Sequence, residues 1–190
     1  VLSDVGGGNA TFSNATDTKL FHNHDGLGFL NMSTPANVDT SIMGWGVVWF
    51  DYDNDGFQDL YLASSKLDSV VANEETSLFF HNDTQGAFEL YNDSIVGDIV
   101  CSSYAPVKGD INNDGFYDLA VLNDGVPSNL FMNSASENSY IKITPVGTAS
   151  NKMAIGTKVY VYTQGIQQYQ RVTCGSGICS QSSQHLIFGT

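Results

Sequence analysis

Two short acidic segments carry the residues best suited to chemistry. They read Asp51-Tyr-Asp53-Asn-Asp55-Gly56-Phe57-Gln-Asp59 and Asp110-Ile-Asn112-Asn-Asp114-Gly115-Phe116-Tyr-Asp118. Each places side-chain oxygens at loop positions 1, 3, 5 and 9, the glycine permits a sharp turn, and the carbonyl of Phe57 or Phe116 at position 7 can add another oxygen. Oxygen ligands in this number suit Ca²⁺, which takes about six to eight of them. We therefore predict two calcium sites.

EF-hand and dockerin loops, and sites for zinc or magnesium, have requirements that these segments do not meet. An EF-hand needs Glu at position 12, where this chain has Leu62 and Val121, and it needs helices rather than strands on both sides. A dockerin-type pair also requires a helix after each loop. Zinc would call for His or Cys ligands, and magnesium for a stricter octahedron. An ion-free turn is the remaining alternative, and two copies with matched spacing count against it.

The segments that must position these loops are typical of β-strands. Residues 44–50 and 60–63 flank the first loop, and residues 104–107 and 119–122 flank the second, all rich in aromatic, β-branched or other apolar side chains. Residues 140–144, 157–162 and 168–173 alternate apolar and polar positions, and glycine-bearing turns separate them. Because no segment shows a convincing amphipathic helical pattern, we predict an all-β protein.

Internal repeats organise the first part of the chain. The two acidic loops are offset by 59 residues, and a Leu-Phe element recurs at Leu20, Leu78 and Leu130, with its first two copies 58 residues apart. The unit is seen about twice. The first nine residues match residues 121–129 at four positions, so the chain reads as starting inside a repeat whose own acidic loop is missing. We therefore interpret the chain as a fragment of a longer polypeptide.

Charge divides the chain near residues 137–139. Residues 1–138 hold 20 acidic and 3 basic side chains, a net charge of −17, whereas residues 139–190 hold 4 basic and no acidic side chains, a net charge of +4. We predict calcium-binding repeats over 1–138 and a small β module over 139–190. Such opposite charges also favour head-to-tail contact between domains or subunits.

Several classes of function are disfavoured. Seven basic residues in a chain of net charge −13 cannot form a surface that follows nucleic-acid phosphates. No apolar run approaches the roughly 18 residues of a membrane span. The four histidines (His22, His24, His81 and His185) lie in no nucleophile–base pattern, and neither a G-x-S-x-G elbow nor a P-loop is present. We expect no enzymatic activity, with a calcium-dependent hydrolase as the open alternative.

Sequons and cysteines indicate an extracellular or cell-surface location. The N-x-S/T pattern predicts glycosylation at Asn9, Asn14, Asn31, Asn82 and Asn92. Cys174 and Cys179 enclose a short glycine-containing turn and are predicted to form a disulfide, which requires an oxidising compartment. Cys101 is then either a buried free thiol or half of an intermolecular bridge.

The motifs resemble known families. Residues 44–62, with the Leu-Phe-x-Asn elements such as residues 20–29, resemble FG-GAP/VCBS repeats, as in integrin-α propellers. Residues 140–189 resemble the ASPIC/UnbV module that follows such repeats in cartilage acidic protein and its bacterial relatives, chiefly at residues 150–159 and 175–189. The resemblance implies propeller-type blades with calcium in inter-strand loops, followed by a small β module. About two blades cannot close alone, and the module stops at Thr190, where the family normally continues.

These observations lead to one expected function and one alternative. We expect an extracellular calcium-binding glycoprotein unit with a structural role, in which calcium is a structural ion and the partners are other copies or further repeats. The alternative is an adhesion module that binds glycans or extracellular proteins. Trp45 and Trp49 could stack on sugars, but residues four apart share one face of a strand, and burial of that face would count against this alternative.

Overall fold

The structure is a computed structural model that describes residues 2–3, 18–40, 42, 44–65, 76–82, 84, 86–91, 101–134, 137–149, 151–163 and 165–190. Within these ranges the ordered elements are β-strands, and no α-helix is present. No helix among these residues is therefore long and apolar enough to cross a membrane. The prediction of an all-β protein is confirmed.

A four-stranded antiparallel sheet forms the centre of the molecule. Its strands follow one another in the order β5-β6-β7-β8, an up-and-down meander like one propeller blade, with bounds Gly44–Phe50, Asp59–Ser64, Leu78–Asn82 and Phe88–Leu90. Strand β6 is buried along its whole length. This explains its nearly continuous apolar sequence, because both of its faces contact other apolar side chains.

A second sheet repeats the first three strands of this meander. Strands β9 (Ser103–Gly109), β10 (Asp118–Asn123) and β11 (Asn129–Phe131) pair antiparallel in that order, and β9 packs against β5. The two sheets enclose an apolar core that includes Val48, Phe50, Tyr61, Leu119 and Val121. The acidic loops are the β5–β6 and β9–β10 connections, so both occupy the same place in their sheets.

A bulge in β5 separates the two tryptophans. The register of β5 against β6 shifts between Gly44 and Gly46, which inserts Trp45 as an extra residue. Trp45 contacts Tyr104, with ring centroids 5.4 Å apart, whereas Trp49 contacts Phe88 on β8 at 5.9 Å. Each indole therefore packs within the fold against a different neighbour.

Short strands at the start of the described chain form two further antiparallel pairs. Strand β1 (Leu2–Ser3) pairs with β2 (Thr18–Lys19), and β3 (Phe21–Asn23) pairs with β4 (Phe29–Asn31). The Leu-Phe element at residues 20–21 begins the β3–β4 hairpin, and its second copy at residues 78–79 begins the β7–β8 hairpin.

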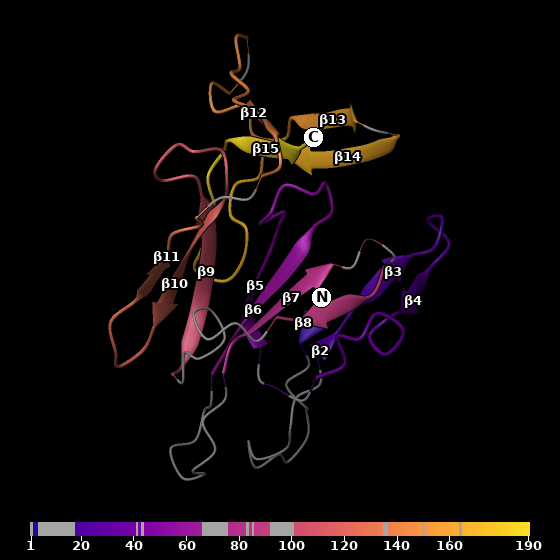
Figure 1. The fold of residues 1–190 in the computed structure, drawn as a ribbon, viewed down its shortest axis with the longest axis vertical. Coiled ribbons are helices and arrows are strands. Elements are labelled where there is room, and N and C mark those ends of the chain that lie inside the picture. The colour runs from indigo at the N-terminus through magenta and orange to yellow at the C-terminus, as the bar shows by residue number, and fades with distance from the viewer. Residues whose placement is uncertain are drawn as a thin grey trace.

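Four strands form a small module that lies across one end of both sheets (Figure 1). Strand β12 (Tyr140–Ile143) pairs with β15 (Leu186–Gly189), and β13 (Lys158–Thr163) pairs with β14 (Ile166–Arg171). Val172, Leu186 and Phe188 form its buried centre. None of the sheets closes into a barrel among the described residues. The fold is thus partial propeller-like blades followed by a small β module, as predicted.

Candidate metal centre

The first acidic loop is held by hydrogen bonds between its own side chains and backbone. Asp51 accepts hydrogen bonds from the backbone N–H groups of Asp55 and Gly56, at 3.0 and 2.9 Å, and Asp55 accepts one from Phe57 at 2.8 Å. Asn54 and Gly56 have positive φ values of 59° and 93°. These are left-handed conformations that Asn and Gly adopt most readily, so the Asn-Asp-Gly sequence suits this turn.

Asp59 joins the loop to the neighbouring strand. Its carboxylate accepts hydrogen bonds from the backbone N–H groups of Tyr52 at 3.0 Å and Asn82 at 2.9 Å. His81 Nδ1 lies 3.0 Å from the same carboxylate, and its ring N–H can donate to the ionised form. His81 was not predicted as a site residue. It directly precedes the asparagine of the recurrent Leu-Phe element, and this position in the repeat is the sequence feature that could have pointed to it.

Three carboxylates of this loop converge. Oxygens of Asp51, Asp53 and Asp59 lie within 4.8 Å of one another, and a second group consists of Asp53, Asp55 and His81. Asp51 and Asp59 are 1% and 0% exposed. Burial, together with the neighbouring carboxylates, raises the pKa of Asp51 to about 7, and burial likewise raises the pKa of Asp59 to about 7. The nearby Lys108 ammonium group therefore does not offset the cost of burying these carboxylates.

This donor set fits Ca²⁺. Oxygens on opposite sides of a calcium ion lie roughly 5 Å apart, since each is about 2.3–2.6 Å from the ion. The mutual spacing of the three carboxylates is within that limit. The oxygen-rich set is also the kind that hard cations prefer. The half-buried Phe57 follows the turn, and the role of its carbonyl as a ligand stays a prediction.

The second loop has the same backbone design. Asp110 accepts hydrogen bonds from the backbone N–H groups of Asp114 and Gly115, both at 3.1 Å, and Asp114 accepts one from the buried Phe116 at 2.9 Å. Asn113 and Gly115 have φ values of 61° and 90°, close to those of Asn54 and Gly56. The repeat inferred from the sequence is therefore also a repeat of local conformation.

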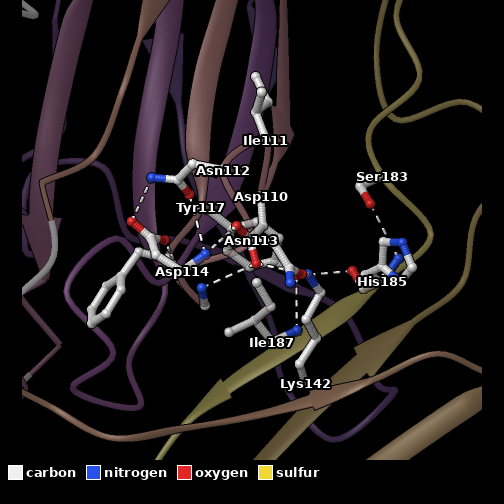
Figure 2. Close-up of polar contacts among 12 residues, drawn as sticks. Asp110, Ile111, Asn112, Asn113, Asp114, Tyr117, Lys142, Ser183, His185 and Ile187 are labelled. Atoms are coloured by element: carbon white, nitrogen blue, oxygen red, sulfur yellow. Dashed lines mark hydrogen bonds and ion pairs between the residues drawn. The ribbon is translucent and has the colours of Figure 1, made fainter.

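A lysine from the module distinguishes the second loop from the first. Lys142 Nζ lies 2.7 Å from Asp110 Oδ2 and 2.6 Å from Asn113 Oδ1 (Figure 2). Asn112 donates to Asp114 at 2.7 Å. Among the described residues, this loop forms no cluster of three carboxylate or histidine ligands. An ammonium group thus supplies part of the positive charge that an ion would bring.

Asp118 repeats the role of Asp59. Its carboxylate accepts hydrogen bonds from the backbone N–H groups of Ile111 at 2.7 Å and Asn133 at 2.9 Å. Ile111 and Asn133 correspond to Tyr52 and Asn82 of the first unit. The asparagine of the Leu-Phe element therefore has a structural role: its backbone fixes the carboxylate at loop position 9.

Both loops lie where the sheets meet the module. Asn54 donates to the carbonyl of Gly115 at 3.1 Å, which connects the loops directly, and Asn138 donates to the carbonyl of Asp53 at 2.9 Å. Gly189 in β15 packs against the backbone of Asn54 with no room for a side chain. The buried Tyr117 hydroxyl accepts a hydrogen bond from Ile187 N–H at 3.0 Å. An ion in these loops would therefore also support the module.

The predicted modification sites have different environments. Asn31 is exposed, and its carbonyl oxygen accepts hydrogen bonds from Ser33. Asn82 is half-buried, and its amide donates to the carbonyl of Gln58 at 3.2 Å, so it takes part in the fold. Asn9, Asn14 and Asn92 lie outside the described residues.

The cysteines are all free in the structure. Cys174 and Cys179 are exposed, and the turn between them is closed by a backbone hydrogen bond from Ser176 N–H to the Ser180 carbonyl at 3.1 Å. The Cys174–Cys179 disulfide is thus not formed here and stays a prediction for oxidising conditions. Cys101 is half-buried rather than fully buried, and its sulfur lies 3.6 Å from Ser103 Oγ.

Comparison with known proteins gives a match for one part of the chain. Residues 147–190 match the family model described as ASPIC and UnbV. This match supports the resemblance inferred for the C-terminal module and covers β13, β14 and β15 but not β12. No curated protein matches the chain.

Proposed function

We propose that this chain is part of an extracellular calcium-binding glycoprotein in which FG-GAP/VCBS-type blades and an ASPIC/UnbV-type module form a structural unit. The observation that carries the proposal is the convergence of Asp51, Asp53 and Asp59 within 4.8 Å at the junction between sheet and module. Two of these carboxylates are buried. Such a group is unfavourable without a cation, and calcium would both neutralise it and connect the elements around it.

The two loops are expected to bind calcium with different affinities. In the first loop, Asp51, Asp53, Asp55 and Asp59 would hold the ion. In the second, Asp110, Asn112, Asp114 and Asp118 are the corresponding set, but Lys142 already contacts Asp110. Calcium must compete with this ammonium group, so we expect the second site to be weaker.

The edges of the second sheet support a role in assembly. Among the residues that the structure describes, β11 is an edge strand, and Leu130 and Met132, within and directly after it, are 54% and 47% exposed. Edge strands with exposed apolar side chains are normally covered in native proteins. Further repeats of the same polypeptide, or a second copy, would cover this edge. The extracellular location rests on the sequons and on the predicted Cys174–Cys179 disulfide.

The proposal is tested by thermal unfolding in millimolar calcium and in excess chelator, with particle size measured in parallel. Calcium at about 100 times its dissociation constant stabilises a protein by about 2.7 kcal/mol. We expect a stabilisation of this order, and dissociation of any assembly when calcium is removed. Equal melting temperatures in calcium and chelator would contradict the calcium assignment.

Variants separate the two loops. Asp53→Ala should remove most of the stabilisation by calcium, because Asp53 belongs to both ligand clusters of the first loop. Asp114→Ala should remove only the smaller contribution of the second loop. Lys142→Met is the matched control, because it removes the competing cation and should tighten calcium binding by the second loop. Unchanged calcium titrations in all three variants would exclude these loops as the binding sites.

A further inference from the structure

One face of the β13–β14 hairpin carries a cluster of exposed tyrosines. Tyr160 and Tyr169 are directly opposite in the register, with ring centroids 4.9 Å apart, and Tyr162 is on the same face two residues along β13. Their exposed fractions are 50%, 46% and 71%. The opposite face, including Gln168 and Gln170, is buried against β15. The tyrosines are thus directed away from the module's own core.

Two basic side chains stand next to this cluster. Lys158 and Arg171 are exposed and are directly opposite each other in the same register. Like charges at directly opposed positions destabilise a sheet. Residues 139–190 contain no acidic side chain, and among the described residues neither group forms an ion pair. These two charges therefore do not stabilise the fold, but they could bind an anionic ligand.

A cleft adjoins the hairpin where it meets the sheets. It has a volume of about 460 Å³, within the usual range for small-molecule sites, and its lining includes Tyr169, Arg171, Lys108, Ser182 and Ser183. Hydroxyl groups and basic side chains are donors suited to carboxylate, sulfate and sugar hydroxyl groups. The cleft shares Tyr169 and Arg171 with the exposed face.

We propose that this tyrosine face and the adjoining cleft bind a short acidic sugar, in which a pyranose ring stacks on Tyr160 and Tyr169 and its carboxylate or sulfate contacts Arg171 and Lys158. Tyrosine offers a flat apolar ring together with a polar hydroxyl, which matches the alternating apolar and polar surfaces of a sugar. The site uses none of the predicted calcium ligands, although Gln58 of the first loop and Tyr117 of the second line the cleft. Because the chain carries a net charge of −13, a short ligand is favoured over a long polyanion, which the remaining surface would repel.

The test is a binding titration of the full chain, in calcium, with matched neutral and acidic oligosaccharides. The probes are lactose, lactose 3′-sulfate, 3′-sialyllactose, maltotriose and trigalacturonate, with inorganic sulfate as the charge-only arm. We expect at least one acidic sugar to bind about ten-fold more tightly than its neutral partner and than sulfate alone. The sulfated and carboxylated probes distinguish the two sources of charge. Failure of all acidic probes, or equal binding of neutral and acidic probes, would overturn the proposal.

Variants locate the site. Tyr160→Ala and Tyr169→Ala should each weaken binding by about ten-fold, and Arg171→Gln should remove the preference for acidic probes. Arg171→Gln leaves both stacked rings in place, so it keeps the test valid if the paired tyrosines prove necessary for folding. Phe29→Ala and Lys152→Gln are the controls: Phe29 is 72% exposed on β4, and Lys152 is an exposed module lysine outside the hairpin. Loss of binding in these controls would contradict the assignment.

Self-association is the competing occupant of this face. If the acidic part of a second copy covered it, the protein alone would form oligomers that dissociate in salt and in Tyr169→Ala, and no sugar would compete. That result would overturn the sugar site while leaving the calcium proposal intact. Conversely, sugar binding that persists in Asp53→Ala would support this inference even if the loops bound no calcium.

Discussion

Lys108 is a half-buried basic side chain that lines the cleft between the sheets and the module. Its ammonium group donates to the carbonyl of Trp49 at 2.8 Å and lies 4.4 Å from the centre of the Tyr117 ring. Burial lowers the pKa of Lys108 to about 8, and the nearby Asp51 partly opposes this shift. The interactions with Trp49 and Tyr117 therefore do not fully replace the water that the charge loses.

The lowered pKa of Lys108 predicts how stability depends on pH. Between pH 8 and 10.5 the unfolded chain keeps the proton that the folded chain has lost, so the unfolded state binds more protons and stability rises with pH. Lys108→Met has no titrating amine at this position. Relative to this variant, the free energy of unfolding of the wild type should rise by up to about 3 kcal/mol across this pH range. Chemical unfolding in calcium at pH 7.5, 9 and 10.5 measures the difference. A flat difference would show that the amine keeps its ordinary pKa, and exposed Lys152→Met should show no such trend.

The second acidic loop shows how one element fixes the position of another. Gly115 combines a φ of +90° with direct packing against the partly exposed ring of Tyr140 in β12, so a side chain there would have to displace this ring. Gly125, in the β10–β11 turn, has a φ of +72°, but no neighbouring atom lies within 4 Å of the point that a methyl group would occupy. Gly115 is therefore required both for its backbone conformation and for its contact with Tyr140, whereas Gly125 is required for its backbone conformation alone.

Replacing these two glycines separates the two requirements. Gly125→Ala should cost about 1 kcal/mol, because only the left-handed conformation is penalised. Gly115→Ala should cost more, up to about 3 kcal/mol, because the methyl group must also displace the partly exposed Tyr140 ring and with it the contact between loop and module. Denaturant unfolding of both variants measures the costs. Equal costs would mean that Tyr140 moves freely and that this contact adds nothing to stability.

At the scale of the whole molecule, the module covers the end of the sheets at which both acidic loops lie (Figure 1). Contacts from Asn54, Tyr117 and Lys142 cross this junction. The loops are therefore structural connections between parts of the chain as well as candidate ion sites. A well-ordered conformation of the loops should therefore stabilise the module, even though calcium would contact none of its strands.

This arrangement predicts long-range protection by calcium. Amide hydrogen exchange in β15 should accelerate when chelator removes the ion, along with exchange in the two loops, because Gly189 packs on Asn54 and Ile187 N–H bonds to Tyr117. The β3–β4 hairpin is the internal control, since its hydrogen bonds run within residues 20–33. Acceleration confined to residues 51–59 and 110–118 would show that the ion does not support the module.

Much of the fold and of the loop design could be predicted from the sequence, because the signals are local. The Asp-x-Asp-x-Asp-Gly pattern satisfies the backbone of its own turn within five residues, as the bonds from Gly56 to Asp51 and from Gly115 to Asp110 show. The strands around these loops are marked by short apolar and alternating segments. The match to residues 147–190 likewise rests on a contiguous stretch of sequence.

The tertiary structure decided which groups meet across long separations in the chain. Lys142 reaches Asp110 over 32 residues, His81 reaches Asp59 over 22, and Asn138 reaches Asp53 over 85. Because of the bulge in β5, the two tryptophans contact different residues. The register of the β13–β14 hairpin places Tyr160 next to Tyr169. Sequence by itself determined the strands, the turns and the carboxylate content of the loops, because these depend on near neighbours. The packing of sheets and module determined the partners of each loop and the composition of the exposed face, because contacts between distant segments exist only once the apolar faces are buried together.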